Sequence, residues 1–106
     1  MRRVTIPGMT RPTKLEAREV DAWVAAHSEW KAEGGKALSR AFTFPDFSTA
    51  LAFVVRVGMA AEKKDHHPDV ELGWGKARVS WSTHDAGGIT SLDLELATIT
   101  DSFAHA

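Results

Sequence analysis

The chain has 106 residues, of which 43% are hydrophobic and 25% are charged, and it contains no cysteine. This length fits one domain with a buried core, and the composition excludes disulfides, thiolate nucleophiles and zinc sites with cysteine ligands. The formal net charge of -1 argues against nucleic-acid or membrane binding as the primary activity. Nothing in the sequence indicates a signal peptide or a membrane span, so we expect a cytoplasmic protein.

The hydrophobic pattern predicts a loose N-terminal arm at residues 1–12 and a single domain at residues 13–106. The arm contains two prolines and a glycine, which disfavour regular structure. From Thr13 the apolar spacing becomes helical, and Thr13 with Glu16 has the spacing of a capping box. We therefore expect a first helix that starts at about Thr13 and fades near His27.

A β-hairpin and a long helix are predicted next. Residues 37–44 alternate between apolar and polar side chains, and the glycines at 34–35 offer a turn. Pro45 stops the strand, and Asp46 is suited to cap a helix over residues 47–65.

The long helix is apolar on two sides. One side, at the spacing of a core face, carries Phe47, Leu51, Val54, Gly58 and Ala61. The second side carries Phe53, Val57 and Ala60. We expect one side to pack on the sheet and the other to contact another subunit.

A second hairpin is predicted over residues 70–83, with Trp74 in a glycine-flanked turn. A loop at 85–88 follows, and Thr90 or Ser91 caps a last helix. The predicted order is α-β-β-α-β-β-α: an α+β fold in which three helices pack on one face of a four-stranded antiparallel sheet.

Three of the five histidines lie between Glu62 and Asp93, at His66, His67 and His84. Histidine titrates near working pH, so this cluster indicates proton chemistry, metal binding or a solvated helix end. At a helix C-terminus, cationic histidines complement the dipole without any further role.

A metal site would use Glu62 and His66, spaced i, i+4 on one helix face, with His84 as a third ligand. Acid–base catalysis would use the imidazoles as proton donor and acceptor, with carboxylates to orient them. Trp74 or Trp81 could form an aromatic wall for a flat ligand. The residues leave these alternatives open, although the helical zinc motif H-E-x-x-H is absent.

Asp93 has a structural explanation of its own. With Thr90 as N-cap, Asp93 falls at position N3, where a carboxylate stabilises a helix start. Such a carboxylate can still direct one oxygen into a cleft. Asp65 and Asp85 are expected to be solvated, and His27 and His105 lie outside the cluster with no predicted partner.

The spacing of the cluster resembles the signature of the pterin-4a-carbinolamine dehydratases. The matching residues are Glu62-x3-His66-His67-Pro68, then Trp74, His84 and Asp93. The run from Ser82 to Thr90 is similar to the histidine loop of bacterial members, and the resemblance extends outward to Trp30 and to the Phe42–Phe47 segment. One departure is Trp74-Gly75-Lys76, where many relatives have Tyr-Asn-Lys.

The resemblance implies removal of water from a 4a-hydroxytetrahydropterin to give quinonoid dihydropterin, which recycles the cofactor of aromatic amino acid hydroxylases. It implies that His66 and His84 form the acid–base pair, that His67 helps to bind the pterin and that Asp93 orients a histidine. The substrate-binding positions that it implies are Glu62, Trp74, Thr83 and Asp85. No metal or organic cofactor is implied, and the expected assembly is a homodimer or homotetramer.

A second class of function is compatible with the same resemblance. Relatives include a dimerisation cofactor of a transcription factor and factors that resemble assembly chaperones. The chain is therefore also a candidate for a non-catalytic binding or assembly protein on the same fold.

Overall fold

The computed structural model describes residues 12–104, so residues 1–11 of the predicted arm lie outside the described part. The elements are α1 (Ala17–Ala26), β1 (Lys31–Glu33), β2 (Ala37–Thr43), α2 (Phe47–Lys64), β3 (Asp69–Gly73), β4 (Lys76–Trp81), a 3-10 turn η1 (His84–Ala86) and α3 (Ser91–Ala104). This order confirms the predicted α-β-β-α-β-β-α arrangement and the α+β fold. Over residues 12–104, no helix is long and apolar enough to cross a membrane.

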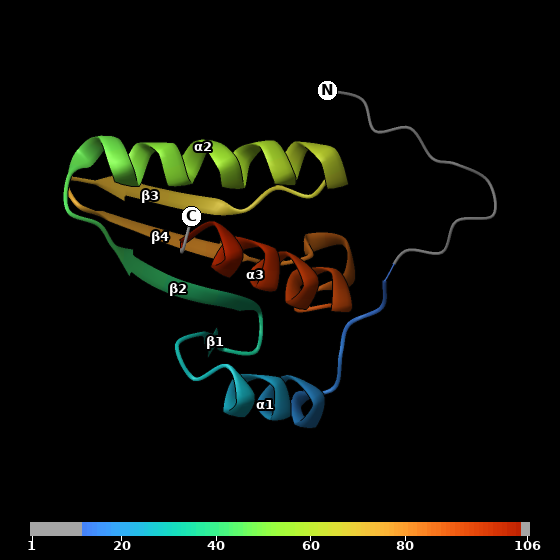
Figure 1. Ribbon diagram of the computed structural model, residues 1–106. Helices are drawn as coiled ribbons and strands as arrows, with labels where there is room; N and C mark the ends of the chain where they lie inside the picture. The colour runs from blue at the N-terminus through green and yellow to red at the C-terminus, as the bar shows by residue number, and fades with distance from the viewer. Residues whose placement is uncertain (1–11, 105–106) are drawn as a thin grey trace.

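The four strands form one antiparallel sheet in the order β1-β2-β4-β3. The register pairs Leu38 with Trp81 and Phe42 with Ala77, so these four side chains project from the same face. All four are buried. Figure 1 shows α2 beside β3, α3 lying across β4 and β2, and α1 beside β1, and the element contacts agree. The core therefore lies between this face and the helices.

The first helix starts later than the sequence predicts. It begins at Ala17 with Glu16 as N-cap, and the Glu16 N–H donates to Glu19 Oε1 over 3.3 Å. The predicted box of Thr13 and Glu16 is therefore wrong, because Glu16 and Glu19 have the same i, i+3 spacing and form the box instead. The end of the helix, with His27 as C-cap, is as predicted.

The cap of α2 is confirmed, and its predicted core face is right at Ala61 but wrong at Phe47, Leu51 and Gly58. Asp46 Oδ1 accepts the N–H of Thr49 over 2.8 Å. The residues of α2 buried in the core are Ala50, Phe53, Val57 and Ala61. Phe47, Leu51 and Gly58, which the pattern assigned to the core, are exposed. Two apolar sides have the same helical period, so the pattern alone does not say which one faces the sheet.

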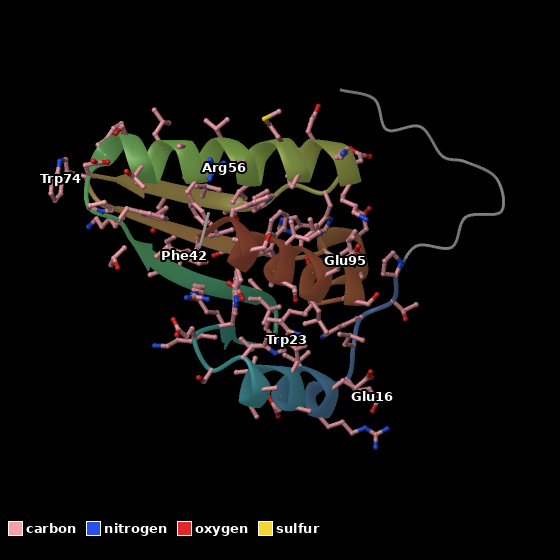
Figure 2. All side chains as sticks on the ribbon, in the orientation of Figure 1. Glu16, Trp23, Phe42, Arg56, Trp74 and Glu95 are labelled. Carbon is pink, nitrogen blue, oxygen red and sulfur yellow. The ribbon has the colours of Figure 1, made fainter. Side chains whose placement is uncertain are left out.

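The stripe formed by Phe47, Leu51, Val55 and Met59 recurs every fourth residue on α2, and its side chains are between 41% and 69% exposed. Figure 2 shows side chains projecting from α2 on the side away from the sheet. We call these four residues the α2 stripe.

One polar anchor holds α3 to the sheet. Asp101 accepts the indole N–H of Trp30 over 3.0 Å and Nη1 of Arg40 over 2.8 Å. Arg40 also lies over the ring of Phe42, with its guanidinium carbon 4.4 Å from the ring centroid, and Nη2 donates to Glu29. The anchor joins the last turns of α3 to β2 and to the segment before β1.

The helix-free face of the sheet carries a second polar group. Glu33 accepts a hydrogen bond from Ser39 Oγ over 2.6 Å and a further one from Arg78. These contacts hold the pKa of Glu33 below its ordinary value, first through Ser39 and then through Arg78. They link β1, β2 and β4 on a face that no helix covers.

Candidate functional site

The centre of the candidate site is a buried pair formed by His66 and Asp93. Helix α2 ends at Lys64, and its C-cap Asp65 has φ of 49° in the left-handed region, which turns the chain sharply. The N–H of His66 still donates to Ala61 O over 3.1 Å, so its backbone stays fixed to the helix end. His66 is 8% exposed, Asp93 is fully buried, and His66 Nε2 lies 2.6 Å from Asp93 Oδ1.

Asp93 serves two elements at once. It lies at N3 of α3, and its Oδ2 accepts the N–H of Thr90 over 2.8 Å, as expected for a capping carboxylate. The same Oδ2 accepts the hydroxyl of Thr83, at the end of β4, over 2.8 Å. The two oxygens are thus divided: Oδ2 fixes the carboxylate in the fold, and Oδ1 holds the imidazole of His66.

Trp81 packs against His66 from the core side. The two rings are stacked, with centroids 6.0 Å apart and an interplanar angle of 11°. Trp81 is fully buried, and its indole N–H donates to Thr100 Oγ1 over 3.0 Å. The predicted role of Trp81 as a wall for a ligand is therefore wrong, because its face is already covered. Its effect is to limit how the imidazole of His66 can tilt.

His67 takes the opposite direction from its neighbour. Its side chain is half exposed, and Nε2 lies 2.6 Å from Oε1 of Glu62, which is itself exposed. A contact between two exposed side chains competes with water and holds the ring only loosely. The two adjacent histidines therefore differ in kind: His66 is buried and fixed, and His67 is at the surface.

His84 lies on the loop after β4, next to Thr83. It begins η1 and is exposed, and the preceding residue, Thr83, contacts Asp93. The loop is closed at its base, because Thr83 and Gly88 exchange backbone hydrogen bonds of 3.0 and 3.3 Å. His84 is thus presented at a short, fastened turn beside the buried pair.

Two distant segments fasten the same loop. The N–H of Leu15 donates to Ile89 O over 2.9 Å, and Ser82 Oγ donates to Lys36 O over 2.6 Å. A β-carbon at Gly88 would lie 2.9 Å from the side chain of Lys14, so glycine permits this close packing. The position of His84 therefore depends on the segment before α1 and on the β1–β2 turn.

The structure does not bring Trp74 to this site within one copy of the chain. Trp74 occupies the β3–β4 turn and is 73% exposed, whereas His66 and Thr83 lie at the other ends of these two strands. Figure 2 shows Trp74 and Glu95, near the start of α3, at opposite ends of the molecule. The expectation of a pocket wall at Trp74 is therefore not supported by the geometry.

The metal alternative loses its proposed ligand pair. Glu62 and His66 share a helix face in sequence, but Glu62 contacts His67 and His66 contacts Asp93. Among residues 12–104 there is no group of three or more potential ligand side chains placed to hold a metal ion.

The family model for pterin 4 alpha carbinolamine dehydratase matches residues 13–103. The chain belongs to this family. A relative from Mesorhizobium japonicum, named "Putative pterin-4-alpha-carbinolamine dehydratase", is 46% identical over 90 residues, which cover 84% of this chain and 91% of the relative. A protein from Gloeobacter violaceus with the corresponding name is 41% identical over 79% of this chain and 95% of its own length.

Two solved structures share the fold of this dehydratase-family chain. One, described as a transcriptional coactivator/pterin dehydratase from Brucella melitensis, is 33% identical, covers 87% of this chain and 99% of its own, and has a TM-score of 0.81. The other, described as a pterin dehydratase-like RuBisCO assembly factor in the alpha-carboxysome, has a TM-score of 0.64 at 20% identity, over 76% of this chain and 94% of its own. The second likeness concerns the fold alone.

The remaining residues singled out in the sequence lie at the following positions in the structure. Thr83 is buried and its hydroxyl is bonded inside the protein, whereas Asp85 is exposed in the first turn of η1. His27 does have a partner: its Nδ1 lies 2.8 Å from Trp23 O and its ring stacks on Trp23. His105 lies outside the described residues.

Sequence reasoning missed the hydroxyl pair of Thr83 and Thr90, whose Oγ1 atoms lie 2.9 Å apart inside the protein. A signal for it exists. Thr83 continues the inward row of Ala77, Val79 and Trp81 on β4, and a polar residue at the end of a buried row needs a hydrogen-bond partner.

Proposed function

We propose that this protein dehydrates 4a-hydroxytetrahydropterin to quinonoid dihydropterin by general acid–base catalysis. The observation that carries the proposal is the buried contact of 2.6 Å between His66 and Asp93, located beside the fastened loop that exposes His84. A histidine fixed by a buried carboxylate is the arrangement that an acid–base catalyst requires. Membership of the family supplies the substrate class.

The reaction requires two proton movements. The bond from C4a to the hydroxyl oxygen breaks, and hydroxide is a poor leaving group unless one group protonates it to water. A second group accepts the proton of N5 as the C4a–N5 double bond forms. In the proposal, His66 and His84 supply these two functions, and the protons balance without a metal or an organic cofactor.

The remaining site residues have supporting roles in this proposal. His67, exposed and next to Glu62, contacts and polarises the pterin from the surface side. Asp93 orients His66 and stabilises its protonated form. Asp85, exposed beside His84, is a candidate contact for the polar edge of the pterin.

The test is the dehydration rate of synthetic 4a-hydroxytetrahydropterin, followed by ultraviolet absorbance. We expect the parent protein to accelerate the reaction and His66→Ala or His84→Ala to lose about 10²- to 10⁴-fold in rate. His27→Gln is the matched control and should keep the parent rate, because His27 is the C-cap of α1 and its ring stacks on Trp23. A folded parent protein with no more than the uncatalysed rate would rule out this function.

We also propose that the protein is a homodimer or homotetramer that uses the α2 stripe. Four exposed apolar side chains in line on one helix are unusual for a surface that faces only water. Beside the stripe, an open groove of about 700 Å³ separates α2 from α3, with Met59, Ala60, Ile99 and Phe103 in its lining.

Light scattering after size-exclusion chromatography tests the assembly. Val55→Glu with Met59→Glu should lower the mass to that of one chain, whereas Ala22→Glu, at an exposed position of α1, should not. An unchanged mass in the double variant would refute the role of the stripe.

The same stripe favours a second candidate function, a binding or assembly role on this fold. The Brucella melitensis relative carries both descriptions, coactivator and dehydratase. The dehydration assay separates the two candidates, because a protein with only the second role would be folded and assembled yet show the background rate.

A further inference from the structure

Thr83 occupies the position that links the two histidines of the proposed catalytic pair. It ends the inward row of β4, it is 7% exposed, and the next residue is His84. Its hydroxyl contacts Oδ2 of Asp93, whose other oxygen holds His66. Thr83 thus adjoins one histidine along the chain and reaches the other through a carboxylate.

The directions of the hydrogen bonds around Thr83 can be worked out from the donors. Its hydroxyl has one hydrogen, which it donates to Asp93 Oδ2 over 2.8 Å. With that hydrogen placed on Asp93, Thr90 is the donor and Thr83 the acceptor in the 2.9 Å contact between the two hydroxyls, and the Thr90 hydroxyl also lies 3.5 Å from Asp93 Oδ2. The chain of hydrogens runs from Thr90 to Thr83 and ends on the carboxylate.

The donors at Oδ2 favour one proton arrangement at Asp93, the ionised carboxylate. Oδ2 already receives two hydrogens, from the N–H of Thr90 and the hydroxyl of Thr83, and has no room for a proton of its own. An ionised Asp93 then accepts the hydrogen of His66 Nε2 at Oδ1. With Nε2 occupied in this way, Nδ1 is the nitrogen of His66 that remains for exchange with a substrate.

We propose that Thr83, supported by Thr90, is a positioning residue that holds Asp93 ionised and His66 in its Nε2–H tautomer. The consequence for catalysis rests on the proposed dehydratase function, but the tautomer itself does not. Thr83 is not needed to cap α3, because the N–H of Thr90 already binds Oδ2. Its contribution is the second donor, delivered from β4.

Without the Thr83 hydroxyl, Oδ2 loses a donor that favours the ionised carboxylate. The proton of His66 Nε2 can then move to Asp93 Oδ1 while a proton from water binds Nδ1, so the pair holds one proton more than in the parent. The imidazole would then carry its hydrogen on Nδ1, and the nitrogen available to a substrate would change from acceptor to donor. We expect Thr83→Val, which removes the hydroxyl at nearly constant volume, to lose about ten- to hundredfold in dehydration rate. Thr83→Ser keeps the hydroxyl and should restore the parent rate.

The deciding experiment is ¹⁵N NMR of the imidazole side chains in the full-length protein, with all variants compared at one neutral pH. The parent, Thr83→Ser and the control Thr98→Val, whose exposed hydroxyl bonds only Leu94 O, should show His66 protonated at Nε2. Thr83→Val should show a population protonated at Nδ1. Thr90→Val, which keeps the backbone donor, should shift in the same direction by a smaller amount.

The inference is overturned if His66 shows the same Nε2–H tautomer in Thr83→Val, or in Thr90→Val should the first variant not fold. This outcome is distinct from failure of the proposed function. A parent protein without dehydratase activity would remove the catalytic consequence, and the tautomer would still report whether Thr83 controls the proton on His66.

Discussion

His66 and Asp93 lie in contact, with 2.6 Å between Nε2 and Oδ1, although 27 positions separate them in the chain. His66 follows the C-cap of α2 and Asp93 lies in the first turn of α3, so the contact joins the end of one helix to the start of another. Because Asp93 also caps α3, the geometry of the candidate site and the start of a helix depend on one carboxylate.

Asp93→Asn should therefore reduce both stability and activity. An amide keeps one acceptor oxygen, but its NH₂ group must face a donor, either Thr83 or His66. We expect a loss of about 1–3 kcal/mol in the free energy of unfolding, measured in urea, and at least about a hundredfold loss in dehydration rate. Glu95→Gln, at an exposed carboxylate paired with Lys64, is the control and should change stability by less than about 1 kcal/mol. Parent-like activity in Asp93→Asn would contradict the assigned role.

Asp101→Ala should destabilise the fold without removing any catalytic group. The change leaves the indole N–H of Trp30 and Nη1 of Arg40 without their acceptor in a largely buried position. We expect a loss of about 1–3 kcal/mol in urea unfolding. Glu29→Ala removes the exposed partner of Arg40 and should cost less than about 1 kcal/mol. Equal losses in both variants would show that the buried contacts of Asp101 stabilise the fold no more than the exposed contact of Glu29.

Gly75→Ala should be more harmful than Gly34→Ala. Both glycines have positive φ, 68° and 58°, so a side chain adds backbone strain of about 1–2 kcal/mol in each case. A β-carbon at Gly75 would also lie 2.9 Å from Phe44 O, whereas nothing lies within 4 Å at Gly34. The difference in unfolding free energy between the two variants measures this clash. Identical losses would mean that the β3–β4 turn moves aside without cost.

Asp46 should make the stability of α2 depend on pH. Hydrogen bonds from the Thr49 hydroxyl and then the Thr49 N–H hold the pKa of Asp46 below its ordinary value. A lowered pKa in the folded state stabilises the fold above the unfolded-state pKa, about 3.9, and this stabilisation is lost as pH falls through the folded-state pKa.

The corresponding measurement is the midpoint of thermal unfolding between pH 6 and pH 3. The gap between the parent and Asp46→Ala should be largest near pH 6 and should shrink below about pH 4. Asp46→Asn keeps an acceptor oxygen that does not titrate. The difference in unfolding midpoint between Asp46→Asn and Asp46→Ala should therefore stay constant with pH. If the difference in unfolding midpoint between the parent and Asp46→Ala does not change with pH, the charge of Asp46 does not contribute to stability.

The element order could be predicted from the sequence because each element has a local signal. The glycines at 34–35 and around Trp74 mark the two turns, and Asp46 marks the start of α2. The start of α1 was predicted wrongly because two overlapping i, i+3 pairs compete for the cap. The core face of α2 was predicted correctly only in part, because only contacts with the sheet distinguish its two apolar sides.

For the candidate site, the spacing of residues identifies candidate side chains but does not predict the contacts that they make in the fold. The N3 position of Asp93 follows from local helix chemistry. Its contacts with His66 and Thr83 depend on how α2, β4 and α3 meet, which no local pattern contains. Trp74 belongs to the same motif in sequence, yet within one chain the length of β3 and β4 separates it from His66 and Thr83.

Asp93 and His84 would have different fates in a descendant that no longer performed the reaction. Selection for a folded chain alone would retain Asp93, because α3 and the end of β4 both depend on its carboxylate. His84 is exposed on a turn that is held by backbone hydrogen bonds and by neighbouring segments, so folding places little demand on its imidazole. Between two members of this fold, the residue at the position of His84 is therefore the more informative marker of whether the chemistry has been kept.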